Sequence, residues 1–130
     1  MARRRGRVPF GTWINEFSKI QHAVAMAYDT LRETNPDVYR KIANIKAAGA
    51  YIRLAINKYV LKRVHKYLAS GMPPTEAAKK ALEDLETDPN LRADIVKYLK
   101  AMGLSDTDAN TLVDAVKAVL AKAITLLGKA

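Results

Sequence analysis

Residues 37–68 read DVYRKIANIKAAGAYIRLAINKYVLKRVHKYL, a stretch whose apolar residues recur at helical spacing and whose charges past Asp37 are all positive. No Asp or Glu occurs between Val38 and Thr75, so the ion pairs that neutralise most basic helices cannot form within the stretch. The neutralising anions must therefore come from outside it. The pattern predicts one long basic helix with the cations Arg40, Lys41, Lys46, Arg53, Lys58, Lys62, Arg63 and Lys66.

A regular helix over this stretch would have a charged side and an apolar side. Most of the cations fall on one side together with Tyr51 and Tyr59, whereas Lys46 and Arg53 fall within the apolar arc. We expect these two side chains to face nucleic acid from that arc, where the small residues 47–50 would let a phosphate chain approach. The alternative is that they reach water along their apolar stems, on an ordinary solvated basic face.

The predicted helix is long for its chain. A straight helix over residues 37–68 would measure roughly 50 Å, whereas a compact domain of this size is about 36 Å across. We therefore expect the helix either to project beyond the domain or to bend near Gly49. Either shape suits wrapping around a partner.

The positive charge is concentrated in the first half of the chain. The 130 residues carry a formal net charge of +9 and no Cys, which excludes disulfides and thiolate metal sites. Residues 1–70 hold 14 Lys and Arg against 4 Asp and Glu, a net charge of +10, and residues 71–130 hold 8 against 9. The first half is therefore predicted to contact a polyanion.

The chain divides into three segments of one structural unit. Residues 1–11 form a basic N-terminal arm whose four Arg suit bidentate phosphate contacts. Residues 12–70 form a helical hairpin for wrapping nucleic acid, in which Thr12 caps an amphipathic helix to about Glu33 and Asn35-Pro36 begins the long basic helix. Residues 71–130 form helices for packing and subunit contacts. We thus predict an all-α helical bundle with a long basic helix hairpin and an extended basic arm.

Local signals divide the last segment into three helices. Pro73 and Pro74 end the basic helix and open a short one to about Glu86, Asp88 and Pro89 begin the next, which runs to about Met102, and Ser105 caps the last. The last helix has an apolar stripe that could cover either its own bundle or a neighbouring subunit, formed by Leu112, Val113, Val116, Val119, Leu120, Ala123 and Leu127.

Motifs for catalysis, metals and cofactors are missing from the sequence. His22 and His65 lie on different predicted helices without a metalloprotease spacing, and no Ser has a nucleophile-elbow context. We therefore predict no enzyme activity, no metal site and no cofactor. A helix-turn-helix made of residues 91–102, the turn 103–105 and the helix after it has suitable lengths. Asp106, Asp108 and Asp114, however, would repel phosphates near the end that enters the groove.

The basic arm, the two helices that carry nearly all of the excess charge and the neutral helical remainder together resemble the major coat proteins of filamentous viruses of hyperthermophilic archaea. The comparison is with the rudivirus, lipothrixvirus and tristromavirus groups. The short chain and the junction at Asn35-Pro36 look closest to the tristromavirus coats. The resemblance lies in the order of the segments along the whole chain. It does not depend on a diagnostic motif.

The resemblance implies a structural virion protein that wraps linear double-stranded DNA in A-form and assembles into a helical filament in the host cytoplasm. Tristromavirus coats use two different coat chains and an outer lipid envelope, so the implied partners are DNA, further copies of this chain, a paralogous coat chain and lipid. The implied nucleic-acid-binding residues are Arg3, Arg4, Arg5, Arg7, Lys19, Arg40, Lys41, Lys46, Arg53, Lys58, Lys62, Arg63 and Lys66.

Other functions fit parts of the same pattern. Neutralising phosphates without reading bases is what a coat for DNA of any sequence requires. A cellular chromatin or RNA-binding protein would share the charge without forming a filament. The remaining alternatives are the helix-turn-helix regulator and a membrane-surface protein that uses residues 106–130 as an interfacial helix.

Overall fold

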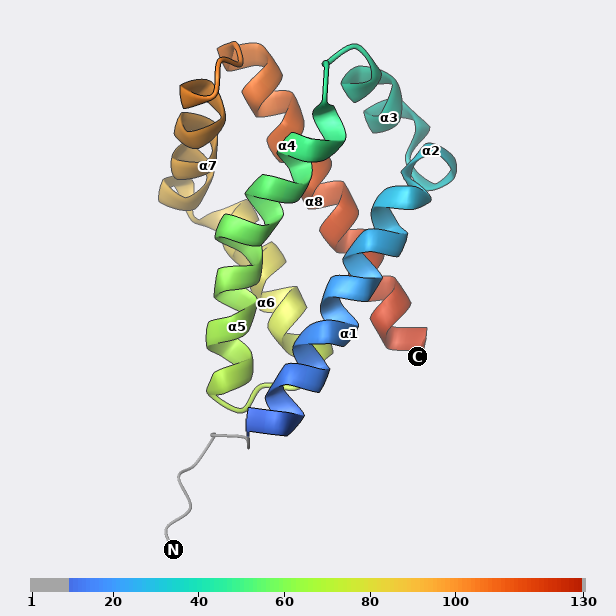
Figure 1. Cartoon of the computed structure of the whole chain (residues 1–130), viewed down its shortest axis with the longest axis vertical. Helices are drawn as coiled ribbons and strands as arrows, with labels where there is room; N and C mark the ends of the chain where they lie inside the picture. Colours follow the sequence, from blue (N-terminus) through green and yellow to red (C-terminus); the bar gives the residue numbers. More distant parts are fainter. Residues whose placement is uncertain (1–9, 130) are drawn as a thin grey trace, which may run out of the picture.

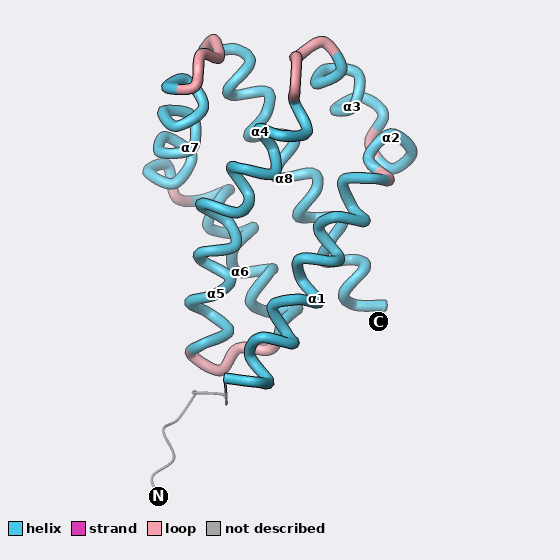
Figure 2. Tube along the Cα trace, viewed as in Figure 1, coloured by secondary structure: helices cyan, strands magenta, loops and turns pink. Residues whose placement is uncertain are grey.

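The computed structural model describes the backbone of residues 10–129 and the side chains of residues 17–128. The described chain consists of helices joined by short turns, which confirms the predicted all-α bundle (Figures 1 and 2). In chain order the elements are α1 (Phe10–Asp29), α2 (Leu31–Thr34), α3 (Pro36–Ala43), α4 (Ala48–Ala55), the π-helical turn η1 (Ile56–Val60), α5 (Leu61–Ala69), α6 (Pro74–Thr87), α7 (Pro89–Ala101) and α8 (Asp106–Lys129).

The last helix, α8, is the centre of the bundle. It contacts α1, α3, α4, α6 and α7, and in Figure 1 it runs behind α4 and α1. Its apolar stripe is buried inside this chain, since Leu112, Val113, Val116 and Val119 have no exposed surface and Leu120 has almost none. The stripe therefore covers its own bundle, and a neighbouring subunit cannot use it while the bundle is closed.

Most helix starts lie where the local sequence chemistry puts them. The Asn35 side chain accepts a hydrogen bond from the Val38 N–H at 3.3 Å, directly before Pro36. Asp88 accepts from the N–H of Asn90 at 2.9 Å, and Ser105 accepts from the N–H of Asp108 at 3.1 Å. Two starts differ: α1 begins at Phe10 and not after Thr12, and α4 begins at Ala48 without a side-chain cap.

The prediction of one long helix over residues 37–68 is wrong. The helix stops at Ala43, and a turn over residues 44–47 precedes α4 (Figure 2). Ala47 has a left-handed backbone with φ of 60°, a conformation that no α-helix can continue through. The physical reason is packing: Ile42 before the turn, Ile45 within it and Ile52 beyond it are all buried in the core. A straight helix would outreach the bundle and leave one end uncovered.

A second departure from the regular helix follows directly after the eight residues of α4, at η1. There the N–H of Leu61 donates to the carbonyl of Ile56, five residues back, so the turn holds one residue more than an α-turn. One extra residue rotates everything beyond it by about 100°. Buried residues continue through the turn, since Ile52 and Ile56 are followed by both Val60 and Leu61 and then by Val64. The π-turn brings both halves of the buried stripe onto one side.

Candidate nucleic-acid interface

The exposed side of α4, η1 and α5 carries a line of cations that we call the cation ridge, formed by Arg53, Lys58, Lys62 and Lys66. The first interval is five residues and ends inside the π-turn, and the others are four. All four side chains are exposed, but Arg53 faces α1, whereas the ammonium of Lys58 lies against Tyr98 of α7. Successive members are about 6 Å apart along the axis. Residues 48–69 contain no Asp or Glu, and none of the ridge cations has an ion pair with a described residue.

Lys58 is held by aromatic rings. Its ammonium lies 5.9 Å from the ring centroid of Tyr59 and 5.3 Å from that of Tyr98 on α7, and the two rings meet edge to face at 5.5 Å. Burial raises the pKa of the Tyr59 hydroxyl, and the nearby Asp94 and Tyr98 raise it further. The phenol therefore stays neutral, and the rings fix Lys58 without removing its charge.

Arg63 is placed differently from its neighbours on α5. Its Nη1 lies 3.0 Å from Oδ2 of Asp84, and its Nη2 lies 3.3 Å from Oδ2 of Asp88. Asp84 is buried, and it also accepts a hydrogen bond from the hydroxyl of Tyr67 and lies 3.8 Å from the ammonium of Lys80. Arg63 thus ties α5 to α6 and to the start of α7, and its charge is neutralised within the chain.

The pKa values in this cluster follow from the same contacts. Burial opposes the charge of Arg63, but the hydrogen bonds and charges of Asp84 and Asp88 outweigh it, so the pKa of Arg63 is raised. The hydrogen bond to Asp84, together with burial, raises the pKa of Tyr67. The N–H of Asn90 lowers the pKa of Asp88, and Arg63 contributes to the same shift. Each group is therefore held in its ordinary charge state at neutral pH.

The remaining predicted binding residues do not join the cation ridge. Arg40 and Lys41 are exposed on α3, beyond the break in the helix and at the other end of the bundle from α5 (Figure 1), and Arg40 pairs with Asp37. Lys19 is exposed on α1. Arg3, Arg4, Arg5 and Arg7 lie outside the described residues.

Lys46 and Arg53 were expected within an apolar arc, and that prediction is wrong. Both are exposed, Lys46 in the turn before α4 and Arg53 at the start of the cation ridge. The arc was drawn on a regular helix, whereas the turn at residues 44–47 and the π-turn both change the rotation between successive parts of the chain.

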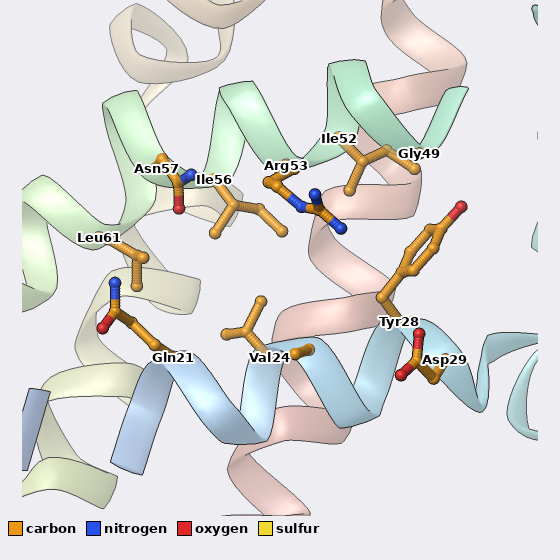
Figure 3. Close-up of a pocket in the computed structure, with 11 residues that line it drawn as sticks. Gln21, Val24, Tyr28, Asp29, Gly49, Ile52, Arg53, Ile56, Asn57 and Leu61 are labelled. Atoms are coloured by element: carbon orange, nitrogen blue, oxygen red, sulfur yellow. The ribbon is translucent and has the colours of Figure 1, made fainter. Parts of the chain in front are cut away.

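A groove with a volume of about 260 Å³ lies beside the cation ridge, between α1 and α4–η1 (Figure 3). Ile52, Ile56 and Val24 form its floor, and Arg53 projects into it from the α4 side. At one end the hydroxyl of Tyr28 lies so close to Gly49 that a Cβ there would be 2.5 Å from it. Only glycine therefore fits at position 49 without a shift of Tyr28.

Two features of this surface had no obvious signal in the sequence, and one had a signal that a fixed helical period hides. Along the chain, Asp84 is 21 residues from Arg63, and Tyr98 is also distant from Lys58, so neither contact follows from local spacing. The π-turn contains the five-residue interval from Ile56 to Leu61, which is hidden by the equally buried Val60 four residues after Ile56.

Three other possible indications of function are a metal site, a membrane-spanning helix and a similar known protein. The residues with described side chains include no group of three or more His, Asp or Glu that could hold a metal ion. Within the same part of the chain, every helix is too short or too polar to cross a membrane. Comparison with protein-family models, with curated proteins and with solved structures found no match.

Proposed function

We propose that this chain is a structural coat protein that covers linear double-stranded DNA regardless of sequence and assembles into a helical filament, as part of a virion. The observation that carries the proposal is the cation ridge, an exposed line of Arg53, Lys58, Lys62 and Lys66 with no carboxylate on the same helices. Evenly spaced cations match a backbone of repeating phosphates, and they carry no pattern of donors and acceptors for reading bases.

Filament formation needs contacts between copies, and the position of α8 limits where these can lie. Because its stripe is buried in the bundle, the subunit contacts must use other surfaces of residues 75–130 or of the first half. The exposed large apolar side chains of the described chain are Met26, Tyr39 and Leu54, on α1, α3 and α4. These helices are therefore candidates for contacts with a second copy or with a paralogous coat chain. The A-form of the duplex and the outer lipid rest on the resemblance alone.

A helix-turn-helix regulator fits this arrangement less well. The second helix of such a motif would be α8, and it would have to enter the major groove of DNA. Ala109, Leu112 and Val113 on its first turns are buried against the rest of the bundle, and the exposed residues there include Asp106. A chromatin-type protein shares the ridge and differs by not forming a filament.

The binding test uses duplexes of unrelated sequence and a range of salt concentrations. Neutralising four phosphates gives a slope of about −3.6 in a plot of log affinity against log salt, or roughly 150-fold weaker binding at 200 mM than at 50 mM. Replacing the four ridge cations with Gln should remove this part of the slope. The matched control replaces Lys79, Lys97, Lys117 and Lys122 on α6, α7 and α8, which changes the net charge equally and leaves the Asp84 cluster intact.

Electron microscopy of the protein with long linear duplex tests assembly. We expect filaments of even width with the wild-type chain and the control variant, and none with the ridge variant. Tight preference for one short sequence would refute the coat function, and so would equal slopes in the ridge and control variants.

A further inference from the structure

The groove between α1 and α4–η1 contains hydrogen-bonding groups that the bundle does not use. The side chains of Gln21, Tyr28, Arg53 and Asn57 line it, and none of them has a hydrogen bond or ion pair with a described residue. Figure 3 shows the guanidinium of Arg53 pointing into the middle of the groove above Val24. The site thus pairs one permanent cation with an aliphatic floor.

The shape of the groove limits what can occupy it. An α-helix with its side chains is about 10 Å across, which is too wide for a hollow of about 260 Å³. The volume is close to the lower end of small-ligand sites, which begin at about 300 Å³. A narrow apolar chain fits this space, and Arg53 selects a chain that ends in an oxyanion.

The charges along the groove set the direction of such a ligand. Asp29 lies at one end, beside Tyr28, and would repel an anion (Figure 3). The apolar floor continues on the other side of Arg53 past Ile56 to Leu61, where a shallower hollow leads on to Phe17. An alkyl chain would therefore run away from Asp29, over a distance of about 12 Å from the level of Arg53 to that of Leu61.

We propose that this groove binds a monomeric single-chain aliphatic anion, a medium-chain carboxylate or alkyl phosphate, with its oxyanion on Arg53 and its chain on Val24, Ile56 and Leu61. Gln21 and Asn57 border the groove from the two facing helices at its Leu61 end, where the alkyl chain would finish (Figure 3). This site is separate from the contact with DNA that we propose for the cation ridge, although Arg53 belongs to both.

The first experiment measures binding of hexanoate, octanoate, decanoate and dodecanoate to the full chain by calorimetry, each below the concentration at which it forms micelles. Affinity should rise roughly fourfold for each added methylene and then level off once the chain covers the floor. Decanol tests the need for the oxyanion, and inorganic phosphate tests the need for the chain. Both should bind at least about tenfold more weakly than decanoate.

Variants then locate the site. Arg53→Gln should weaken decanoate binding by about tenfold or more, whereas Lys58→Gln, on the same ridge but outside the groove, should leave it unchanged. Ala25→Phe fills the groove from its exposed rim and should abolish binding, while Met26→Phe, exposed on the same helix but outside the groove, is its control. Circular dichroism of each variant confirms that the bundle is intact.

Several results would overturn the proposal. Decanol that binds as tightly as decanoate, together with an unaffected Arg53→Gln variant, would show that no oxyanion site exists. Unchanged binding to Ala25→Phe would place the ligand elsewhere, and no binding to any member of the series would exclude the site. Binding only to vesicles of an anionic two-chain lipid, with none of the monomeric acids bound, would assign the surface to membrane contact instead. Each of these outcomes is independent of whether the chain binds duplex.

Discussion

Two adjacent residues of α5, Lys62 and Arg63, should respond in opposite ways to the same substitution. Lys62 is exposed on the cation ridge, whereas Arg63 is bonded to Asp84 and Asp88. Lys62→Gln should therefore reduce duplex binding and leave stability unchanged. Arg63→Gln should reduce stability and leave the salt dependence of binding unchanged.

The size of the stability loss follows from the surroundings of Asp84. Removing one partner of a buried ion pair costs about 3–5 kcal/mol. The side chain of Arg63 is 33% exposed, and Asp84 keeps Tyr67 and Lys80 nearby, so a smaller loss applies here. We expect Arg63→Gln to lower the free energy of unfolding by about 2 kcal/mol. For a chain of this length that corresponds to a fall in Tm of roughly 8 °C.

Thermal unfolding followed by circular dichroism measures the change in stability. Duplex titrations between 50 and 200 mM salt measure the salt dependence of binding. Losing one phosphate contact in Lys62→Gln should change the slope by about 0.9, which alters the affinity ratio across this range by about 3.5-fold. The reasoning is refuted if Arg63→Gln unfolds at the wild-type temperature and flattens the salt slope as much as Lys62→Gln does.

Three further predictions concern the groove, the π-turn and the buried cluster. Gly49→Ala should lower Tm because the new Cβ meets the Tyr28 hydroxyl, and adding Tyr28→Leu should restore much of the loss; equal effects with and without Tyr28 would contradict this. Deleting Asn57 should convert the π-turn into a regular α-turn and leave a cooperative thermal transition, whereas loss of that transition would show that the turn is required for folding. The hydrogen bond to Asp84 raises the pKa of Tyr67 above its usual value of 10.0, so its contribution to stability is complete below pH 10 and is lost as the pH rises further; urea unfolding should show a weaker alkaline decline in Tyr67→Phe.

Helix ends were predictable where one residue determines them. Asn35, Asp88 and Ser105 supply caps from their own side chains, and a following proline or acidic residue adds to the signal, so the sequence alone locates these starts. The apolar period of α8 likewise identified residues that are buried in the structure. These features depend on neighbours within a few positions.

The bend that was expected near Gly49 lies instead at residues 44–47 and is a full break, and the π-turn was not predicted. Both are set by contacts with other helices. Residue 47 is an alanine, which a helix accepts, and the left-handed turn there is imposed by burying Ile42 and Ile45 in the core. A fixed period of 3.6 residues also conceals an interval of five. For the same reason the sequence identified the cations of the ridge but not their alignment, and it assigned Arg63 to nucleic acid although its partners lie on α6 and at the start of α7.

Like charges stand one helical turn apart along the cation ridge, from Lys58 to Lys62 and from Lys62 to Lys66, and each such pair destabilises a helix by a few tenths of a kcal/mol. Salt screens this repulsion in the free protein. The same salt competes with the protein for phosphates when duplex is present. Ionic strength should therefore stabilise the folded chain and weaken its hold on DNA at the same time, through the same three lysines.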